Sequence, residues 1–500
     1  MTLRFVARLF TMLALGTSII RGAQQPSADP NAEADRKIMA EAKANNELMK
    51  NLEYLSDMLG PRLTGSETLT RAGRWAEQKF GEYGAGNVHH EPWILGRSWS
   101  RGTAEGRIVS PAEHRITIAS YGWTAGTAGA VRGTVIYVNA GKPADLEAYR
   151  GKLKGAIAIL YQPQDLEPPE NPILVPYGES ILPMNKGNPP MDFRFFAPLY
   201  QFLTEQGTAA ILVPSDKTHG LLNTFSLGWL AQPTTKGVNL STVTGESYGI
   251  AATPTAYVAW EDYNLIWRLL QHGPVEIELN IQNSSSAKPV EVYNTVAEIK
   301  GSEKPDEVVM LGAHLDSWDL GTGATDNGTG SVAVLEAARA LAKSGVRPKR
   351  TIRFVLFSGE EEFLLGSRAY VNSHKSELAK ISAILVHDIG TGRVTSIDLQ
   401  GDYAARETMD GVMAPLGDLG LLEPSQRSIY ASDNNAFDDA GVPGFICLQE
   451  VLDYNQTHHS QADTFDRVRE PGLVQGAEVL AVWAYNVAQL PELLSRKQVH

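Results

Sequence analysis

Four separate stretches of the sequence carry histidines and carboxylates that could bind metal ions. The first, HLDSWDLGTGATDNG, contains His314, Asp316 and Asp326. The other three are SGEEE at 358–362, HDIG at 387–390 and DYNQTHHSQADT at 453–464. Imidazole and carboxylate ligands together suit a divalent ion such as zinc. Each stretch alone has a simpler explanation, because Asp and Asn favour turns and a run of glutamates usually faces solvent.

Apolar runs before these stretches suggest why they could act together. The runs at 308–311, 351–357 and 383–386 are short and bounded by Gly or polar residues, which indicates buried strands of a parallel sheet. Open α/β sheets bind ligands at the carboxyl ends of their strands. The stretches supply two or more imidazoles and several carboxylates, about what two neighbouring divalent ions and one free carboxylate base require.

The composition narrows the class of protein. The chain has 500 residues, of which 43% are hydrophobic and 20% charged, as in ordinary globular proteins. Its net charge of −13 and the lack of a Lys/Arg run argue against nucleic acid or an anionic membrane as a partner. The single cysteine, Cys447, excludes an internal disulfide and lies in an apolar run that predicts a buried strand.

The N-terminus has the pattern of an export signal. Arg4 and Arg8 precede the apolar residues 9–20, which are too few to span a bilayer comfortably. We therefore interpret residues 1–23 as a signal peptide, with an N-terminal anchor as the alternative, and residues 24–34 as a linker. The expected location is secreted or periplasmic, with no membrane span after cleavage.

The remaining chain predicts one α/β domain interrupted by an insertion. From residue 295 onward, apolar strands alternate with segments of helical periodicity, which implies an α/β sheet with helices on both faces. Residues 107–283 instead contain short β-like segments separated by Gly and Pro, with an irregular loop expected at 163–198. The predicted first domain is therefore split into residues 35–106 and 284–500. Helical patterning is expected at 35–59 and 67–83.

Several motifs resemble the co-catalytic zinc peptidases, the family of bacterial leucyl aminopeptidases and glutamate carboxypeptidase II. They are GPRLTGS at 60–66, the HLDSWDLGTGATDNG stretch, RPKRT at 347–351, AGVPG at 440–444 and HHS at 458–460. The nearest branch is that of carboxypeptidase Q. The resemblance implies a mixed, mostly parallel sheet with helices on both faces and a β-rich protease-associated insertion. It also suggests a homodimer.

The resemblance further implies a site with two Zn²⁺ per chain. One zinc would be held by His314 and Asp388, the other by Glu361 and His459, and Asp326 would bridge them. His459 fits the family pattern His-Ser/Thr-x-x-Asp-Thr better than His458, whose role stays open. The family also has a cis peptide after the bridging aspartate, which implies a cis Asp326–Asn327 bond.

Other residues of the site are assigned by the same resemblance. Asp316 would accept a hydrogen bond from the second ring nitrogen of His314 and so fix its tautomer. The family spacing before Gly366 makes Glu361 the ligand and Glu360 the general base. Glu362 would then lie outside the site. The FLLGS that follows is closer to the bacterial aminopeptidases than to carboxypeptidase Q, so the substrate preference stays open.

The sequence therefore predicts an exported two-zinc metallopeptidase that hydrolyses short peptides. The alternative activity is that of an aminopeptidase releasing N-terminal residues. Two other classes compete: a non-catalytic receptor-like protein on the same scaffold, and a zinc acyltransferase of the glutaminyl cyclase type. The complete ligand set disfavours the receptor, and the insertion disfavours the acyltransferase.

Overall fold

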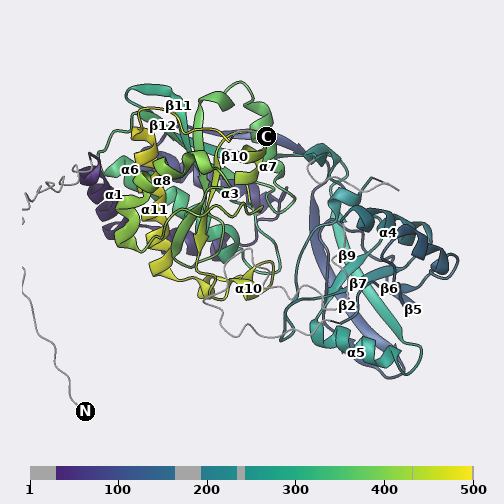
Figure 1. The fold of residues 1–500 in the computed structure, drawn as a ribbon. Coiled ribbons are helices and arrows are strands. Elements are labelled where there is room, and N and C mark those ends of the chain that lie inside the picture. The colour runs from purple at the N-terminus through teal and green to yellow at the C-terminus, as the bar shows by residue number, and fades with distance from the viewer. Residues whose placement is uncertain (1–29, 164–192, 233–241, 431, 498–500) are drawn as a thin grey trace, which may run out of the picture.

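The computed structural model describes residues 30–163, 193–232, 242–430 and 432–497. Their strands form two sheets in two parts of the molecule (Figure 1). The expected signal peptide lies outside the described residues, and the expected linker ends inside helix α1 (Ala32–Ala44). None of the helices in these ranges is both long and apolar enough to cross a membrane.

The first sheet has seven strands and carries the predicted α/β domain. In spatial order they are β1 (Gly86–Leu95), β10 (Val290–Ile299), β12 (Arg350–Phe357), β11 (Lys304–His314), β13 (Ile381–Val386), β15 (Gly444–Gln449) and β14 (Val394–Asp398). The pairs β12–β11, β11–β13 and β13–β15 are parallel, and the other three pairs are antiparallel. The predicted mixed sheet is confirmed, although only its centre is parallel, because β1, β10 and β14 join it antiparallel.

Helices cover both faces of this sheet, as predicted. One face packs against α3 (Glu67–Tyr83), α6 (Thr329–Lys343) and α11 (Glu470–Gln489), and α1 and α2 (Leu48–Glu53) pack on α6 and α11. The opposite face packs against α7 (Leu365–Ser373) and α9 (Asn434–Asp439). Successive side chains of a strand point to opposite faces, so Val309 and Leu311 join the first core and Val308 and Met310 the second.

The helices before the first strand follow their local signals. The Ser66 hydroxyl accepts from the Leu69 N–H and caps α3, which ends at Gly84 in a left-handed conformation. The single helix predicted at 35–59 is instead split into α1, α2 and a π-helical turn, Tyr54–Leu59. The Asn46 side chain bonds to Lys43 O and to Leu48 N, and such local bonds compete with the helix.

The second sheet has eight strands between Trp99 and Ser285. They are β3 (His114–Ile116), β2 (Trp99–Ser110), β9 (Glu276–Ser285), β5 (Val131–Tyr137), β6 (Ile157–Ile159), β7 (Ala210–Pro214), β8 (Thr255–Val258) and β4 (Ile118–Ser120). Helices α4 (Phe193–Glu205) and α5 (Trp260–Leu270) pack into different cores, which places them on opposite faces. Because β5 to β8 are parallel, this part is α/β rather than only β-rich.

The loop predicted at 163–198 ends earlier than expected, because a helix begins inside it. Residues 164–192 of the loop expected at 163–198 lie outside the described residues, but α4 begins at Phe193 and contains Pro198. Apolar packing outweighs the proline here, since Ala197, Leu199 and Leu203 of this helix are buried. The remaining helices are α8 (Arg406–Met413) and α10 (Tyr454–Thr457), and short 3₁₀ turns lie at Pro143–Tyr149, Gly228–Leu230, Gly245–Ser247, Leu378–Lys380, Tyr403–Ala405, Ala414–Leu419 and Phe465–Arg467.

Candidate metal centre

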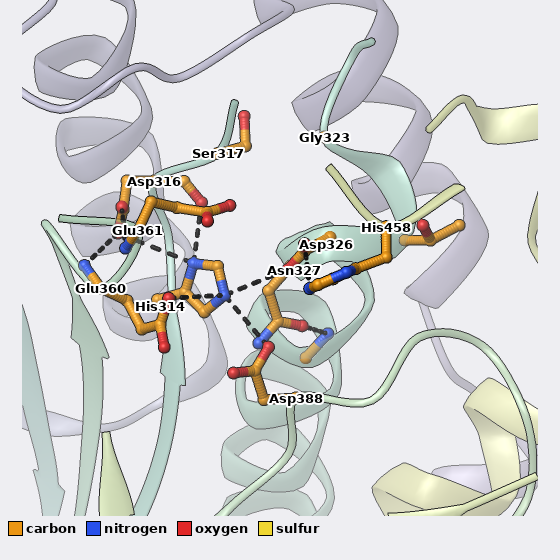
Figure 2. A network of polar contacts seen from close by, with 12 residues as sticks. His314, Asp316, Ser317, Gly323, Asp326, Asn327, Glu360, Glu361, Asp388 and His458 are labelled. Carbon is orange, nitrogen blue, oxygen red and sulfur yellow. Dashed lines mark hydrogen bonds and ion pairs between the residues drawn. The ribbon is translucent and has the colours of Figure 1, made fainter. Parts of the chain in front are cut away.

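The three central parallel strands deliver their polar residues to one edge of the first sheet. His314 is the last residue of β11, the glutamates 360–362 follow β12, and Asp388 follows β13. The β11 register pairs His314 with Phe357, the last residue of β12. The remaining ligand of this group, Asp326, does not follow a strand but lies in the turn before α6. Together the strand ends and this turn place four of the predicted ligands side by side (Figure 2).

His314 forms one half of the centre. Its Nε2 lies 3.0 Å from Asp388 Oδ1 and 3.4 Å from Asp326 Oδ1. All three side chains are almost completely buried. An imidazole nitrogen facing two carboxylate oxygens at these distances could hold a divalent metal ion.

His459 forms the other half, from the loop after α10. Its Nε2 lies 2.9 Å from Glu361 Oε2 and 3.6 Å from Asp326 Oδ2. The two oxygens of Asp326 therefore face different imidazoles, as a bridging carboxylate must. The structure thus brings all five predicted ligands together.

His458 also approaches the centre. Its ring stacks on that of His459 with centroids 3.8 Å apart, and its Nε2 lies 3.8 Å from Asp326 Oδ2. Asp326, His458 and His459 form one possible metal-binding group, beside His314–Glu360–Asp388 and His314–Asp326–Glu361. The His458 side chain is 40% exposed, compared with 21% for His459. The His459 side chain is therefore less exposed than that of His458, and it also lies within hydrogen-bond distance of Glu361.

Asp316 supports the centre differently from the prediction. The Nδ1 of His314 is 3.0 Å from the main-chain oxygen of Asp316 and 3.7 Å from its carboxylate, so the main chain is the nearer acceptor. The carboxylate accepts instead from the Thr64 hydroxyl at 3.1 Å and from the N–H groups of Glu360 and Glu361 at 3.4 Å. Asp316 therefore orients the glutamate turn as well as the histidine.

The three adjacent glutamates occupy different surroundings. Glu360 and Glu361 line the large cavity above the centre, and Glu362 does not. Glu362 is nevertheless completely buried, and the charge of Asp316 acts on it. Burial, followed by the charges of nearby carboxylates, raises the pKa of Glu362 well above its usual value. The same two effects raise the pKa of Glu360 and Glu361.

Arg62, in the GPRLTGS motif, lies completely buried under the metal-binding loop. Its guanidinium donates to the main-chain oxygens of Leu315, Thr322 and Gly323 at 2.6–3.1 Å. Burial lowers the pKa of Arg62 to about 10, which leaves it charged at neutral pH. Because Arg62 fills the acceptors of an irregular buried loop, it stabilises the turn that presents Asp326. The GPRLTGS motif was among those that resemble the family, but the sequence assigned no role to Arg62.

Asp463 is a second residue that was not assigned. Its Oδ1 accepts from the N–H of Thr325 at 2.6 Å and from the Thr325 hydroxyl at 2.8 Å, directly before Asp326. The His-Ser/Thr-x-x-Asp-Thr pattern contained this residue and could have identified it. On the other side of Asp326 the peptide to Asn327 is cis, as predicted, and Asn327 Nδ2 donates to His387 O at 2.8 Å.

The residues of the centre fit a pair of metal ions. Two imidazoles and three carboxylates are within a few ångströms of each other, and buried charges are stable only when paired. Among the described residues, neither Asp326 Oδ2 nor Glu361 Oε1 has a hydrogen-bond partner. Burial, and then the positive charge of Lys217, lowers the pKa of His459 to about 3, which keeps its imidazole in the neutral form that binds metal.

The buried carboxyls predict an unusual pH dependence for the metal-free protein. Burial raises the pKa of Asp463 to about 7 and that of Asp433 to about 8. The unfolded chain releases these protons near pH 4, so the folded state binds more protons between about pH 4 and 8. We expect the free energy of unfolding to fall as pH rises through neutrality, by up to roughly 1.4 kcal/mol per pH unit for each group.

Chemical denaturation of metal-free protein from about pH 5.5 to 8.5 measures this slope. Zinc-loaded protein should show a weaker slope, since bound cations replace protons in offsetting the negative charge around Asp463 and Asp433. A metal-free protein whose stability rises over the same range would contradict the prediction.

The fold and the site together define a metallopeptidase, and comparisons with known proteins agree. The sequence profile described as "Peptidase family M28" matches residues 294–484. The chain is 30% identical to human carboxypeptidase Q over 469 residues, which cover 93% of this chain and 90% of that protein. This chain belongs to peptidase family M28.

Solved structures of peptidases are similar to this chain over most of its length. The crystal structure of a peptidase M28 precursor from Shewanella amazonensis matches with a TM-score of 0.76 and 27% identity, covering 94% of this chain and 99% of that one. A zinc aminopeptidase from Bacillus subtilis matches with a TM-score of 0.62 and 19% identity, covering 88% and 94%. The second likeness concerns the fold alone.

Proposed function

We propose that this protein is an exported exopeptidase or dipeptidase that binds two zinc ions and hydrolyses short peptides, as carboxypeptidase Q-like enzymes would. The observation that carries the proposal is Asp326, whose two carboxylate oxygens face the imidazoles of His314 and His459. His314 and Asp388 would hold one ion, and Glu361 and His459 the other. Residues 1–23 would direct the export.

Glu360 is the proposed general base. Two bound zinc ions would supply an activated water and polarise the scissile carbonyl. Glu360 lies at the cavity wall, with Oε2 4.0 Å from His314 Nε2, and does not belong to the five proposed ligands. Its carboxylate would take a proton from the attacking water and deliver it to the leaving amine. Burial raises the pKa of Glu360, and a base with a raised pKa accepts a proton more readily.

The cavity supports a small peptide as the substrate. It has a volume of about 1900 Å³ and is walled by both parts of the chain. Phe225 and Thr242 come from the proposed protease-associated insertion, while Phe363 and Tyr430 come from the first domain. The Phe225 and Phe363 rings meet edge to face at 5.6 Å, so the two parts contact each other beside the centre. This arrangement suits short peptides better than folded proteins.

Hydrolysis of blocked and unblocked dipeptides by zinc-loaded protein tests the proposal. Cleavage only of substrates with both termini free would identify a dipeptidase. Cleavage of C-terminally blocked substrates would favour the aminopeptidase suggested by FLLGS, and cleavage of N-terminally blocked ones a carboxypeptidase. Chelation should abolish every activity. A fully zinc-loaded chain that cleaves none of the three sets would instead support a binding protein on this scaffold.

A further inference from the structure

A segment that follows a strand of the second sheet forms hydrogen bonds with the loop that carries His459 and with the helix before it. We call residues 215–227, which follow β7, the clasp. Lys217 Nζ donates to Asn455 O of α10 at 2.7 Å, and the N–H of Thr224 donates to His459 O at 2.9 Å. The N–H of Leu222 donates to Gln461 Oε1 at 2.9 Å. In Figure 1, α10 lies on the side of the first sheet that is turned toward the second.

The backbone of His459 needs such support. Its φ is 53°, a left-handed conformation that is uncommon for residues other than glycine. Strained residues of this kind persist when the surrounding structure fixes them. The clasp bonds to His459 itself and to Gln461, on the C-terminal side of the strained residue. The conformation that aims the His459 ring at Glu361 is therefore held partly from outside the first domain.

Among the clasp residues, Lys217 carries the cost of burying a charged group. It is only 4% exposed although it carries an ammonium group, and buried charges are rare unless they are paired. Its partners are Asn455 O and, at 3.8 Å, Asp216 Oδ1. A buried charge directed at the main chain of α10 fixes the position of that helix. Because the loop that carries His459 directly follows α10, holding α10 in place also holds that loop.

The clasp is itself attached to rigid structure. Asn223 Oδ1 accepts from the Ser215 hydroxyl at 2.7 Å and from the Asp216 N–H at 2.9 Å, which closes the segment on itself. Arg101 of β2 donates to the Thr224 hydroxyl at 2.9 Å and pairs with Asp319 at 2.8 Å. Asp319 belongs to the loop between His314 and Asp326. One arginine thus connects the second sheet, the clasp and the metal-binding loop.

We propose that the clasp sets the metal affinity of the position formed by Glu361 and His459, with Lys217 as its positioning residue. The position formed by His314 and Asp388 is carried by the ends of β11 and β13 of the first sheet, so we expect its affinity to change little when the clasp is broken. This inference rests on the proposed two-zinc function. It gives the second part of the chain a role in completing the metal centre as well as in walling the cavity.

Two substitutions break the clasp from opposite sides. Lys217→Met removes the ammonium but keeps an unbranched side chain, and Gln461→Leu removes the acceptor of the Leu222 N–H. Lys152→Met, at an exposed lysine of the same part of the chain, is the matched control. The readouts are zinc per chain against buffered free zinc and the absorption spectrum of the cobalt-substituted protein. We expect the position formed by Glu361 and His459 to weaken by roughly 10–100-fold in Gln461→Leu, the range typical when outer-sphere partners are lost. The loss should be smaller in Lys217→Met, because that change also removes a positive charge that acts on His459.

The other position and the control should match the wild type, and saturating zinc should restore kcat in both clasp variants. Unchanged affinity at both positions, or equal loss at both, would overturn the inference. If Lys217→Met fails to fold, Gln461→Leu decides alone, because Gln461 is only half-buried. A wild-type chain that binds fewer than two zinc ions would refute the proposed function instead.

Discussion

Glu360→Gln should lower kcat by roughly 10²–10⁴-fold, the usual contribution of a general base, while leaving the metal content unchanged. Glutamine keeps the size of the side chain but cannot accept the proton of the attacking water. Glu360 stands beside the five proposed ligands and is not one of them, so its loss should not release zinc. Steady-state kinetics together with metal analysis of purified protein measure both quantities.

Glu362→Gln is the control for this experiment. Glu362 is buried outside the cavity, and burial raises its pKa well above the usual value, which favours the neutral acid. A neutral amide of the same shape should therefore leave rate and metal content near the wild-type values. An active Glu360→Gln protein would show that this register is wrong. So would an inactive Glu362→Gln protein that retains full metal.

Asp326→Asn should have the second large effect, a loss of metal at both positions. One Asp326 oxygen faces His314 at 3.4 Å and the other faces His459 at 3.6 Å. An amide offers one weaker oxygen ligand and no charge. We expect affinity at both positions to fall by more than about 100-fold, the most that loss of an outer-sphere partner costs. Zinc titration and cobalt spectra measure the two affinities.

Glu361→Gln provides the contrast, since Glu361 Oε2 lies 2.9 Å from His459 Nε2 and is a proposed ligand of that position alone. It should weaken one position and leave the other near the wild-type affinity. If Asp326→Asn also lost only one ion, the bridging role would be refuted. The rest of the ligand set would then need reassignment around His458, which lies 3.8 Å from the same carboxylate.

The central sheet and the ligands it carries were predictable because local signals and burial agree there. Short apolar runs such as 308–311, bounded by Gly and polar residues and rich in Val, favour buried strands over helices. Parallel neighbours then bring His314 and Asp388 to one edge without further information. Cys447 is buried in a strand as expected. Strand β14 was missed because Val394–Asp398 alternates weakly and gains its place only by pairing with β15.

The support around the centre could not be predicted in the same way. Arg101 and Lys217 reach it from another part of the chain, and no periodicity records contacts between residues so far apart. The burial of Glu362 was also hidden, because a third glutamate in a row has no signal that separates it from a solvated one. Helices α4 and α5 were obscured by the prolines and short apolar runs around them.

The bonds made by Arg62 also constrain the order in which the protein can fold. This residue is synthesised early, yet the oxygens it binds at Leu315 and Gly323 come 253 and 261 positions later. Contacts between such distant residues form slowly, since the loop between them must first be closed. The second sheet lies wholly inside that interval and can fold as a unit while the rest emerges. We therefore expect the turn bearing Asp326 to become rigid late in folding, so that a metal ion arriving earlier would meet an unfinished site.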